Sequence, residues 1–411
     1  MEAFHETVEA RGHLVDSHLL ERALDTIVGH DGGFDIEEFR IGRTNVDQSY
    51  LRMRIEAPSE EEVADLLQEL IAFGFVPTSP EDAELQLAER DRCAPLDFYS
   101  TTNHRTEVRL NRRWVAVERQ RMDAAIVVRD GIPECRRLRD VKAGDQVVCG
   151  SRGIRVVPES KERDRLSFAF MSNEISSERQ VETAVRQTAA LIAQVKGEGK
   201  RVVVVTGPVV VHTGGAPSLA GLIREGFIDA LLAGNALGVH DAEAALLGTS
   251  LGIRMADGRQ ADHGHRNHMR AINAIYHAGG IRAAVIAGVL PSGILYECVR
   301  KGVPFVLAGS LRDDGPLPET ITDMNQAQDA YAEHLRGAGL VICLGSMLHS
   351  IATGNMLPSW VKLICVDINP AVVTKVSDRG TGQAIGVVTD VGLFVHTLAK
   401  SLVREVEPVQ A

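Results

Sequence analysis

The sequence is poor in aromatic side chains, has no excess of positive charge and contains no long apolar runs. Of its 411 residues, 4% are Phe, Trp or Tyr although 45% are hydrophobic, so aliphatic side chains must build its cores. The formal net charge of -11 argues against a nucleic-acid or anionic-membrane surface, because either needs a basic patch. No stretch of about 20 apolar residues is free of Pro, Gly or charge, so no membrane span is predicted. The acidic, polar start predicts no secretory signal, and we expect a cytoplasmic location.

Two chemical motifs are also absent. None of the six cysteines forms a Cys-x-x-Cys pair, which excludes zinc-ribbon and thioredoxin-type sites and predicts reduced thiols. No Gly-x-Gly-x-x-Gly stands anywhere in the chain, so the common dinucleotide-binding fingerprint is missing as well. Any nucleotide site must therefore use a different loop.

The length predicts two or three domains, and the first of them is a small α+β unit. Residues 1–90 are predicted to run strand–helix–strand–strand–helix–strand, a ferredoxin-like order of the kind that ACT domains use. One helix has a clear start, since Ser59 can act as its N-cap with Glu62 three residues on. We interpret the unit as a packing or dimerisation module, and an effector-binding role stays open.

The remaining residues fall into a β-rich domain, 91–175, and a larger domain, 176–411. The first contains short strands separated by turn residues. The second opens with a long helix over 176–200 and continues with nearly all-apolar runs, such as 201–207 and 361–367, between helical segments. Continuous apolar strands that alternate with helices are typical of a buried parallel sheet covered on both faces. The fold class is therefore α/β, with a Rossmann-like C-terminal domain.

In such a sheet, ligands bind beyond the carboxyl ends of the strands, so the residues after each strand are the candidates for a site. Gly345 and Ser346 follow one apolar run, and a glycine there lets backbone N–H groups approach a pyrophosphate. Asp367 follows the next run, about 20 positions later, where a carboxylate holds the ribose hydroxyls of NAD and repels the 2′-phosphate of NADP. This pattern favours NAD. The alternative is that Gly345 only forms a turn and Asp367 only caps a helix.

Histidines and a carboxylate gather after two further strands. His212 follows one strand, and His240 with Asp241 follows the next within a Gly-rich connection, where Asp241 could equally be the N-cap of a helix. His265 and His268 are three apart and would share one face of a helix. No metal is predicted, because no third ligand is marked and no Glu stands at zincin spacing. The pair faces a substrate or lies on a helix surface, and both readings stay open.

Several long runs resemble the alternative ornithine cyclodeaminase family of prokaryotes, which carries a region of the LOR/SDH type. They are residues 234–252, 264–273, 344–358, 98–110 and 121–128. The chain is also similar to the C-terminal part of bifunctional arginine dihydrolase–ornithine cyclodeaminase enzymes. The resemblance covers nearly the whole chain but no dihydrolase domain, so arginine hydrolysis is not expected. A homo-oligomer is the expected assembly.

The resemblance implies a nucleotide domain of the deoxyhypusine-synthase type, which binds dinucleotides without the missing glycine fingerprint. In such domains one acidic residue at a strand end holds the adenosine ribose and a later one lies near the adenine, roles that fall here on Asp367 and Asp390. The full set expected to bind NAD is Asn235, Ala236, Asp313, Gly345, Ser346, Met347, Leu348, His349, Asp367, Asp390 and Val391.

The reaction that the resemblance implies converts L-ornithine to L-proline and ammonia, with NAD taking a hydride from the α-carbon and later returning it. Such a site must hold the amines with carboxylates, deprotonate them and exclude water. The residues expected to do this are Asp241, His240, His265, His268, Asp123 and Asn103, with His212 as a further proton carrier. Asn103 and Asp123, together with Arg105, would face the substrate from the β-rich domain.

Two other functions stay open. A saccharopine-type dehydrogenase would consume NAD, and a non-catalytic sensor would bind NAD and an amino acid without turnover. Two substitutions are expected to be informative about the site. Gly345→Val should block the pyrophosphate and leave the fold largely intact, whereas Asp241→Asn should preserve a helix cap but slow a reaction that needs the carboxylate.

Overall fold

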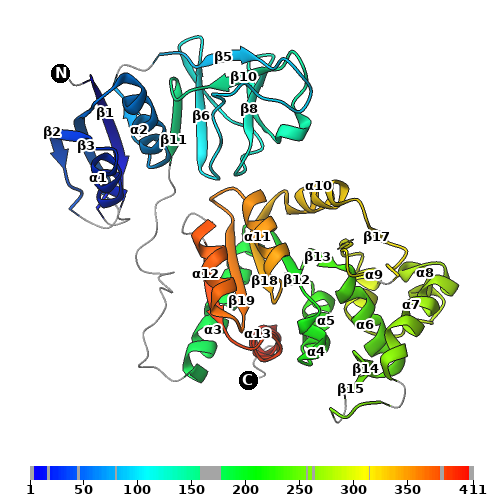
Figure 1. Cartoon of the computed structure of the whole chain (residues 1–411). Helices are drawn as coiled ribbons and strands as arrows, with labels where there is room; N and C mark the ends of the chain where they lie inside the picture. Colours follow the sequence, from blue (N-terminus) through cyan, green and yellow to red (C-terminus); the bar gives the residue numbers. More distant parts are fainter. Residues whose placement is uncertain are drawn as a thin grey trace. The chain divides into compact units, whose positions relative to one another are not determined.

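The computed structural model describes residues 4–15, 19–43, 47–78, 81–157, 177–255, 258–261, 264–313, 315–379 and 384–406. The chain divides into two compact units (Figure 1). Unit 1 is Met1–Ser167 together with Asn355–Trp360, and unit 2 is Phe168–Gly354 together with Val361–Ala411. None of the described helices has both the length and the apolar character needed to cross a bilayer.

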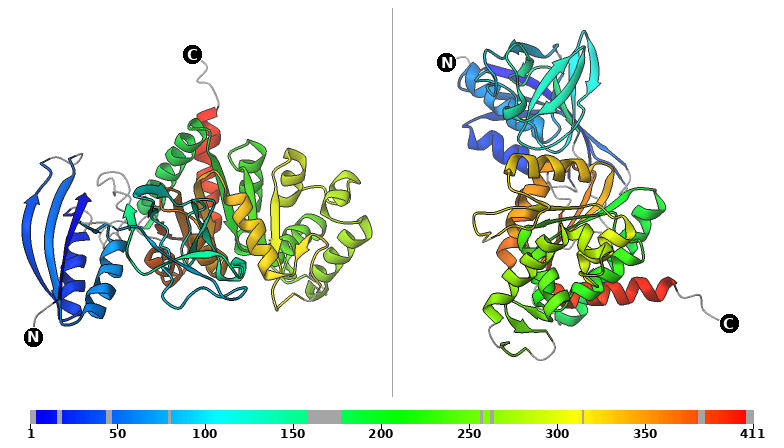
Figure 2. Two further views of the ribbon diagram at one scale, coloured as in Figure 1. Left: turned by 90° about the horizontal axis from the view of Figure 1, so that it is seen from above. Right: turned by 90° about the vertical axis from the view of Figure 1, so that its right-hand side faces the viewer.

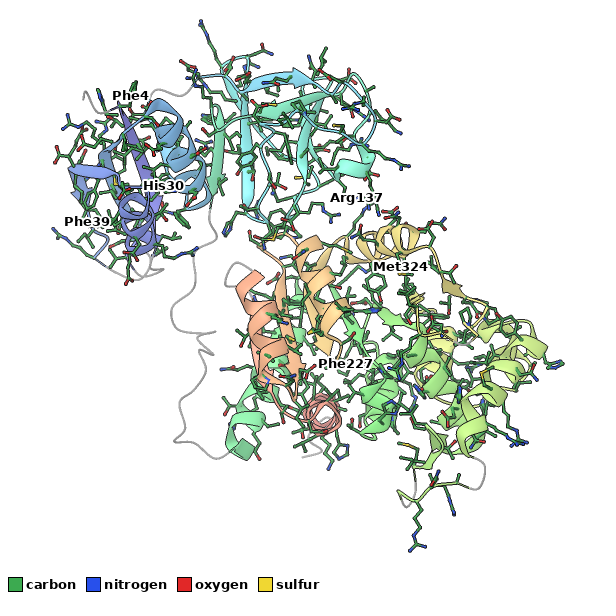
Figure 3. The ribbon with its side chains drawn as sticks, in the orientation of Figure 1. Phe4, His30, Phe39, Arg137, Phe227 and Met324 are labelled. Atoms are coloured by element: carbon green, nitrogen blue, oxygen red, sulfur yellow. The ribbon has the colours of Figure 1, made fainter. Side chains whose placement is uncertain are left out.

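Unit 1 begins with a four-stranded antiparallel sheet in the order β2-β3-β1-β4. Its elements are β1 (Phe4–Gly12), α1 (Leu19–Gly29), β2 (Gly33–Arg40), β3 (Ser49–Ala57), α2 (Glu60–Ala72) and β4 (Val76–Pro77). This confirms the predicted ferredoxin-like order. The core between sheet and helices is aliphatic, with Leu51, Ile55 and Leu66 fully buried. His30, labelled in Figure 3, lies 3.2 Å from the carboxylate of Glu69 and links the end of α1 to α2.

The predicted helix start at Ser59 is confirmed. The Ser59 hydroxyl oxygen accepts the backbone N–H of Glu62 at 3.1 Å, and it donates its own proton to the Glu62 carboxylate at 3.2 Å. These bonds satisfy one of the N–H groups that the first turn of every helix leaves without a partner. Local chemistry alone therefore defines where α2 begins.

The β-rich part of unit 1 forms two small antiparallel sheets, in the orders β5-β10-β8-β9 and β11-β6-β7. The strands are β5 (Glu84–Leu87), β6 (Arg105–Leu110), β7 (Arg113–Ala116), β8 (Ala125–Arg129), β9 (Ile132–Arg136), β10 (Gln146–Cys149) and β11 (Ile154–Val157), with a short 3-10 turn η1 (Leu138–Asp140). Sequence reasoning found five of these and missed β5 and β9, the two edge strands of one sheet. Edge strands carry a weaker apolar pattern, and Pro133 in β9 is tolerated because an edge strand needs fewer N–H donors.

Unit 2 is built on a seven-stranded sheet in the order β17-β16-β13-β12-β18-β19-β20, and every neighbouring pair is parallel. The strands are β12 (Arg201–Thr206), β13 (Ala230–Gly234), β16 (Phe305–Ala308), β17 (Thr320–Ile321), β18 (Ala338–Leu344), β19 (Lys362–Asp367) and β20 (Ala384–Val388). All seven residues of the interior strand β18 are buried, as expected where helices cover both faces. The predicted Rossmann-like parallel sheet is confirmed.

Helices connect these strands on both faces of the sheet. They are α3 (Ser177–Gly197), α4 (Val209–His212), α5 (Ala216–Arg224), α10 (Met324–Leu335), α11 (Met347–Met356), α12 (Pro370–Arg379) and α13 (Val391–Val406). The helices α3, α13 and α5 pack side by side in one layer (Figure 2). Phe227, labelled in Figure 3, lines a small apolar cavity together with Leu222 and Phe394. Connections between parallel strands are expected to be right-handed, which would place the helix that follows β12 and the helix that follows β18 on opposite faces of the sheet.

The connection between β13 and β16 is long and largely helical (Figure 1, green to yellow). It contains α6 (Asn235–Leu247), β14 (Thr249–Ser250), β15 (Ile253–Arg254), the 3-10 turn η2 (Gly264–Arg266), α7 (Asn267–Ala278), α8 (Ile281–Ile286) and α9 (Ile294–Lys301). The predicted Gly-rich connection before Asp241 is wrong, because α6 already begins at Asn235. The helix is buried on nearly all sides and therefore lacks an amphipathic pattern. Gly238 belongs to its packing, since a Cβ there would lie 2.8 Å from Leu317 and 2.9 Å from Leu307.

Candidate active site

The order of the strands reverses between β12 and β18, which are neighbours at the centre of the unit 2 sheet. Helices leave these two strands toward opposite faces, which opens a crevice at their carboxyl ends. The two loops that follow approach each other closely: Gly207 donates its N–H to the carbonyl of Leu344 at 2.9 Å. A Cβ at Gly207 would lie 2.3 Å from the carbonyl oxygen of Gly345. Only glycine permits this approach of backbone to backbone.

Gly345 itself is required for two reasons. Its φ of +57° lies in the left-handed region, and a Cβ there would lie 2.0 Å from Cγ1 of Val209. The expectation that Gly345→Val leaves the fold largely intact is therefore wrong, because the added side chain would displace Val209 whether or not a nucleotide binds. A loss of NAD binding in that variant would not locate the pyrophosphate.

The helix α11 starts directly after this loop. Met347 and Leu348 are 39% and 73% exposed, so the first turn of α11 is reachable from solvent. The first N–H groups of any helix have no partner within the helix, and together with the helix dipole they attract an anion. A left-handed glycine followed by an open helix start fits a pyrophosphate. This supports the predicted role of residues 345–349 without testing it.

Two acidic residues follow the next strands. Asp367 ends β19 and is half-buried; its Oδ1 accepts the N–H of Asn369 at 2.8 Å, and its other oxygen has no hydrogen bond among the described residues. That oxygen is available to a ribose hydroxyl. Asp390 accepts the N–H of Leu393 at 2.8 Å and so caps α13, whose first residue Val391 is buried. Both carboxylates lie where the sequence places them, at the carboxyl edge of the sheet.

Of the other residues expected to bind NAD, Asn235 and Asp313 have hydrogen-bond partners within this unit. Asn235 is buried, and its Oδ1 accepts the N–H of Leu317 and the hydroxyl of Thr320, each at 2.9 Å. Asp313 closes the turn after β16, because its carboxylate accepts the N–H of Ser310 at 2.7 Å. Ala236 is exposed on the first turn of α6. For these residues, contact with the cofactor stays a prediction.

His240 and Glu243 form a hydrogen-bonded pair on α6. Nδ1 of His240 lies 3.2 Å from Oε2 of Glu243, and the carboxylate is fully buried. Glu243 also accepts the hydroxyl of Thr249 at 2.8 Å and the N–H of Gly252 at 3.0 Å. Burial alone would raise the pKa of Glu243, but the hydrogen bonds from His240, Gly252 and Thr249 outweigh burial and lower that pKa. The pair therefore consists of an ionised carboxylate that orients an imidazole.

A second imidazole stands against the first. The ring of His212, at the end of α4, lies edge-to-face with the ring of His240, at a centroid distance of 4.7 Å, and its Nδ1 is 2.6 Å from the hydroxyl of Ser250. Burial, with the neighbouring His240, lowers the pKa of His212, so this ring is neutral at neutral pH. Sequence reasoning found both histidines but missed Glu243 and Ser250. The spacing of three between His240 and Glu243 was the available signal for the carboxylate.

Asp241 points away from this pair and caps another helix. It is 1% exposed; Oδ1 accepts the N–H of Ile294 and Oδ2 the N–H of Leu295, each at 2.8 Å, at the start of α9. The alternative that Asp241 caps its own helix is therefore wrong. Burial raises the pKa of Asp241 to about 6, against the effect of the two N–H donors. A direct part in catalysis stays a prediction.

This geometry changes what Asp241→Asn tests. Each oxygen accepts one N–H, so an amide –NH₂ would replace one acceptor and face a backbone donor. We expect the variant to lose about 1–3 kcal/mol of unfolding free energy in urea denaturation. The matched control is Asp323→Asn, because there a single oxygen accepts both N–H groups of the first turn of α10 and asparagine caps equally well. Equal stability of Asp241→Asn and the parent would contradict the capping role.

His265 and His268 do not share an α-helix, contrary to the prediction. His265 lies in the 3-10 turn η2 and its side chain is outside the described residues, whereas His268 is half-buried in the first turn of α7. Between them, Asn267 donates to the hydroxyl of Thr249 at 2.9 Å and joins α7 to the Glu243 network. Within the described part of the chain, no three His, Cys, Asp or Glu side chains are grouped as metal ligands.

The candidates in unit 1 are Asn103, Arg105 and Asp123. Asn103 is fully buried, its carbonyl oxygen accepts the N–H of Ser359 at 2.8 Å, and its Oδ1 is without a partner among the described residues. The guanidinium of Arg105 lies over the ring of Trp360, 4.5 Å from its centroid. Asp123 is exposed with a φ of +58°. That these residues face the substrate stays a prediction.

The strand order with its reversal point, the close glycine loops and the acidic strand ends define the Rossmann class of dinucleotide-binding domains. The chain matches the Rossmann-fold region of the "Arginine dihydrolase ArgZ-like, C-terminal" family over residues 186–398 and the first region of the same family over 105–185. Residues 5–104 match the "LOR/SDH bifunctional enzyme conserved region". The chain belongs to the ArgZ-like, LOR/SDH-containing family, as the resemblance predicted.

Three relatives illustrate this family. The chain is 48% identical over 405 residues to the ornithine cyclodeaminase of Methanopyrus kandleri, covering 97% of both chains. It is similar to the crystal structure of apo ArgZ, an arginine dihydrolase from the ornithine–ammonia cycle in Cyanobacteria, with 43% identity, a TM-score of 0.86, and coverage of 98% of this chain and 59% of that one. The ternary complex of AgrE with ornithine and NAD⁺ is 46% identical, with a TM-score of 0.55 and coverage of 99% and 58%.

Proposed function

We propose that the protein is an NAD-dependent ornithine cyclodeaminase, which converts L-ornithine to L-proline and ammonia. The observation that carries the proposal is near-full-length similarity, at 48% identity, to a relative named ornithine cyclodeaminase. The relative AgrE, whose complex contains ornithine and NAD⁺, supports both substrate and cofactor. The carboxyl edge of the unit 2 sheet supplies the physical basis, because its glycine loops and acidic strand ends fit a dinucleotide.

NAD would be held at three places on this edge. The loop at Gly345 and the first turn of α11 would bind the pyrophosphate, Asp367 the adenosine ribose, and the start of α13 at Asp390 the adenine end. Bound NAD supplies a hydride acceptor for the α-carbon and a hydride donor for the final reduction. Because Asp367 carries a negative charge, the 2′-phosphate of NADP would be repelled.

The protein's own residues must move protons. Both amines of ornithine are cationic at neutral pH, so each must lose a proton before its nitrogen lone pair can act. We assign the δ-amine to His240, because Glu243 orients its ring as a carboxylate orients the base in other proton-transferring pairs. We assign His212, whose ring meets that of His240 edge-to-face at a centroid distance of 4.7 Å, as the next carrier of this proton.

The assembly and location are further parts of the proposal. We expect a homo-oligomer, and the open edge strand β2 supports it, because Phe34 and Ile36 are 40% and 41% exposed there. Light scattering of the purified protein tests this. The expected location is the cytoplasm, in keeping with a nucleotide cofactor and with cysteines that form no disulfide.

One assay tests the function. Purified protein is incubated with ornithine and a small fraction of an equivalent of NAD, and proline, ammonia and NADH are measured. We expect proline and ammonia in equal amounts, far exceeding the NAD added, and no accumulation of NADH. NADH formed in step with ornithine loss would instead indicate a dehydrogenase of the saccharopine type. Binding of both ligands without turnover would indicate a sensor.

A further inference from the structure

A hydrogen-bonded chain joins α10 to the end of β13 and to the first turn of α11. Tyr331 lies on α10, the helix that begins at Met324 (labelled in Figure 3), and it is 4% exposed. Its hydroxyl oxygen is 2.9 Å from the carbonyl oxygen of Ala233, near the end of β13, and 2.7 Å from Nδ1 of His349, in the first turn of α11. These three residues come from three segments that are distant in sequence.

The two contacts determine where the protons are. A phenol has one proton, and a carbonyl oxygen can only accept, so the Tyr331 proton must point to Ala233. The Tyr331 oxygen then accepts a hydrogen bond, and the contact to His349 requires a proton on Nδ1. The reverse arrangement would bring the hydroxyl oxygen and the carbonyl oxygen to 2.9 Å with no proton between them. Burial raises the pKa of Tyr331 far above its ordinary value, so the phenol stays protonated.

The other nitrogen of His349 is therefore a lone-pair acceptor. Burial lowers the pKa of His349, so the ring is neutral at neutral pH, with its proton on Nδ1 and none on Nε2. No described residue hydrogen-bonds Nε2, and the side chain is only partly buried. A Cβ at Gly234 would lie 3.5 Å from Nε2 and 3.4 Å from Cε1 of His349. The lone-pair edge of the ring thus lies against the end of β13, where the absence of a side chain keeps it accessible.

We propose that Nε2 of His349 accepts the proton of the substrate's α-ammonium group, and that Tyr331 is the positioning residue that holds His349 in the required tautomer. The assignment rests on the proposed function. The α-amine is chosen because the hydride leaves from the carbon that bears it, and His349 stands on the same helix start that would hold the dinucleotide. Among the described residues, no other histidine is given a hydrogen bond to a buried tyrosine hydroxyl that would determine which ring nitrogen carries the proton.

The proton balance is closed. The α-ammonium gives one proton to Nε2, which leaves a neutral amine and an imidazolium whose Nδ1 proton remains bonded to Tyr331. The amine lone pair then assists departure of the hydride. When the α-nitrogen later leaves as ammonia, the imidazolium returns the same proton and ammonium is released. Cationic ornithine becomes neutral proline plus ammonium, with no net gain or loss of protons.

The first test reads the tautomer directly and needs no turnover. Protein labelled with ¹⁵N-histidine is compared with the His349→Gln variant, whose missing signals identify His349 in the parent spectrum. We expect the proton on Nδ1 in the parent. In Tyr331→Phe we expect it on Nε2, because a buried Nδ1–H would lack an acceptor there. A parent His349 with its proton on Nε2 would overturn the proposal.

The second test measures kcat. We expect His349→Gln to lower kcat at least about 100-fold, as for other general bases, and Tyr331→Phe to lower it about tenfold, the cost of one hydrogen bond. The control Tyr276→Phe removes a hydroxyl that donates to the carbonyl of Pro316 at 2.8 Å, on α7, and should leave kcat unchanged. Parent-like kcat in His349→Gln would remove the base, and parent-like kcat in Tyr331→Phe would remove the positioning role. A parent that makes no proline would instead contradict the proposed function, while the tautomer result would stand.

Discussion

Replacing His240 with glutamine is expected to slow proline formation by about 10²–10⁴-fold, the usual contribution of a general base. The substitution keeps a polar side chain of similar reach on α6 but removes the ring nitrogen that exchanges a proton. Glu243 keeps its bonds from Thr249, Leu251 and Gly252, so the buried carboxylate does not lose its other donors. The fold and the nucleotide site should therefore survive, and the loss should fall on kcat.

Steady-state kinetics with ornithine and calorimetric titration with NAD separate these effects. We expect NAD affinity within about twofold of the parent, because His240 lies on α6 rather than on the loops at Gly345 or Asp367. The control is His277→Gln, an exposed histidine near the end of α7, which should match the parent in both measurements. A His240→Gln protein with full kcat would exclude the His240–Glu243 pair from proton transfer.

The second large effect is expected at Asp367. Its free carboxylate oxygen would accept ribose hydroxyls, and a hydrogen bond to a charged group contributes about 1.5–3 kcal/mol. Asp367→Ala should therefore weaken NAD binding by about 10–100-fold. The same change removes the charge that would repel a 2′-phosphate, so the preference for NAD over NADP should decline even more than NAD affinity does.

Titration of parent and variant with NAD and with NADP measures both quantities. Asp329→Ala removes one negative charge from the exposed side of α10 and serves as the control for a general electrostatic change. It should bind both nucleotides as the parent does. Unchanged NAD affinity in Asp367→Ala would place the ribose elsewhere, and unchanged discrimination would show that another feature rejects NADP.

The family resemblance and the local sequence patterns point to the same residues in the loops that follow the strands. Gly345, Asp367 and Asp390 lie at the carboxyl edge of the sheet because each follows an apolar strand, and a parallel sheet brings all such ends to one side. These positions could be predicted by reading along the chain. The steric reason for a glycine at position 345 could not be predicted that way. Any larger residue there would clash with Val209, which is far away in sequence.

The contacts of the candidate catalytic side chains were less predictable. Asp241 follows a strand and stands next to a histidine, but in a helix neighbouring residues point in different directions, and Asp241 turns to α9 while His240 turns to Glu243. Tyr331 carries no motif at all. Its part in the site depends on two contacts, to β13 and α11, that exist only once the sheet has formed.

Four features could be predicted from the residues alone: the α/β class, the ferredoxin-like first sheet, the parallel Rossmann-like sheet and the helix start at Ser59. All of these follow from short-range periodicity, capping chemistry and strand-end residues, which act over a few positions. The extent of α6, the partner of Asp241 and the contact between Tyr331 and His349 depend instead on how the folded chain packs. A fully buried helix has no polar face to mark it, and a buried carboxylate or imidazole takes its role from whichever donor or acceptor the packing brings within about 3 Å.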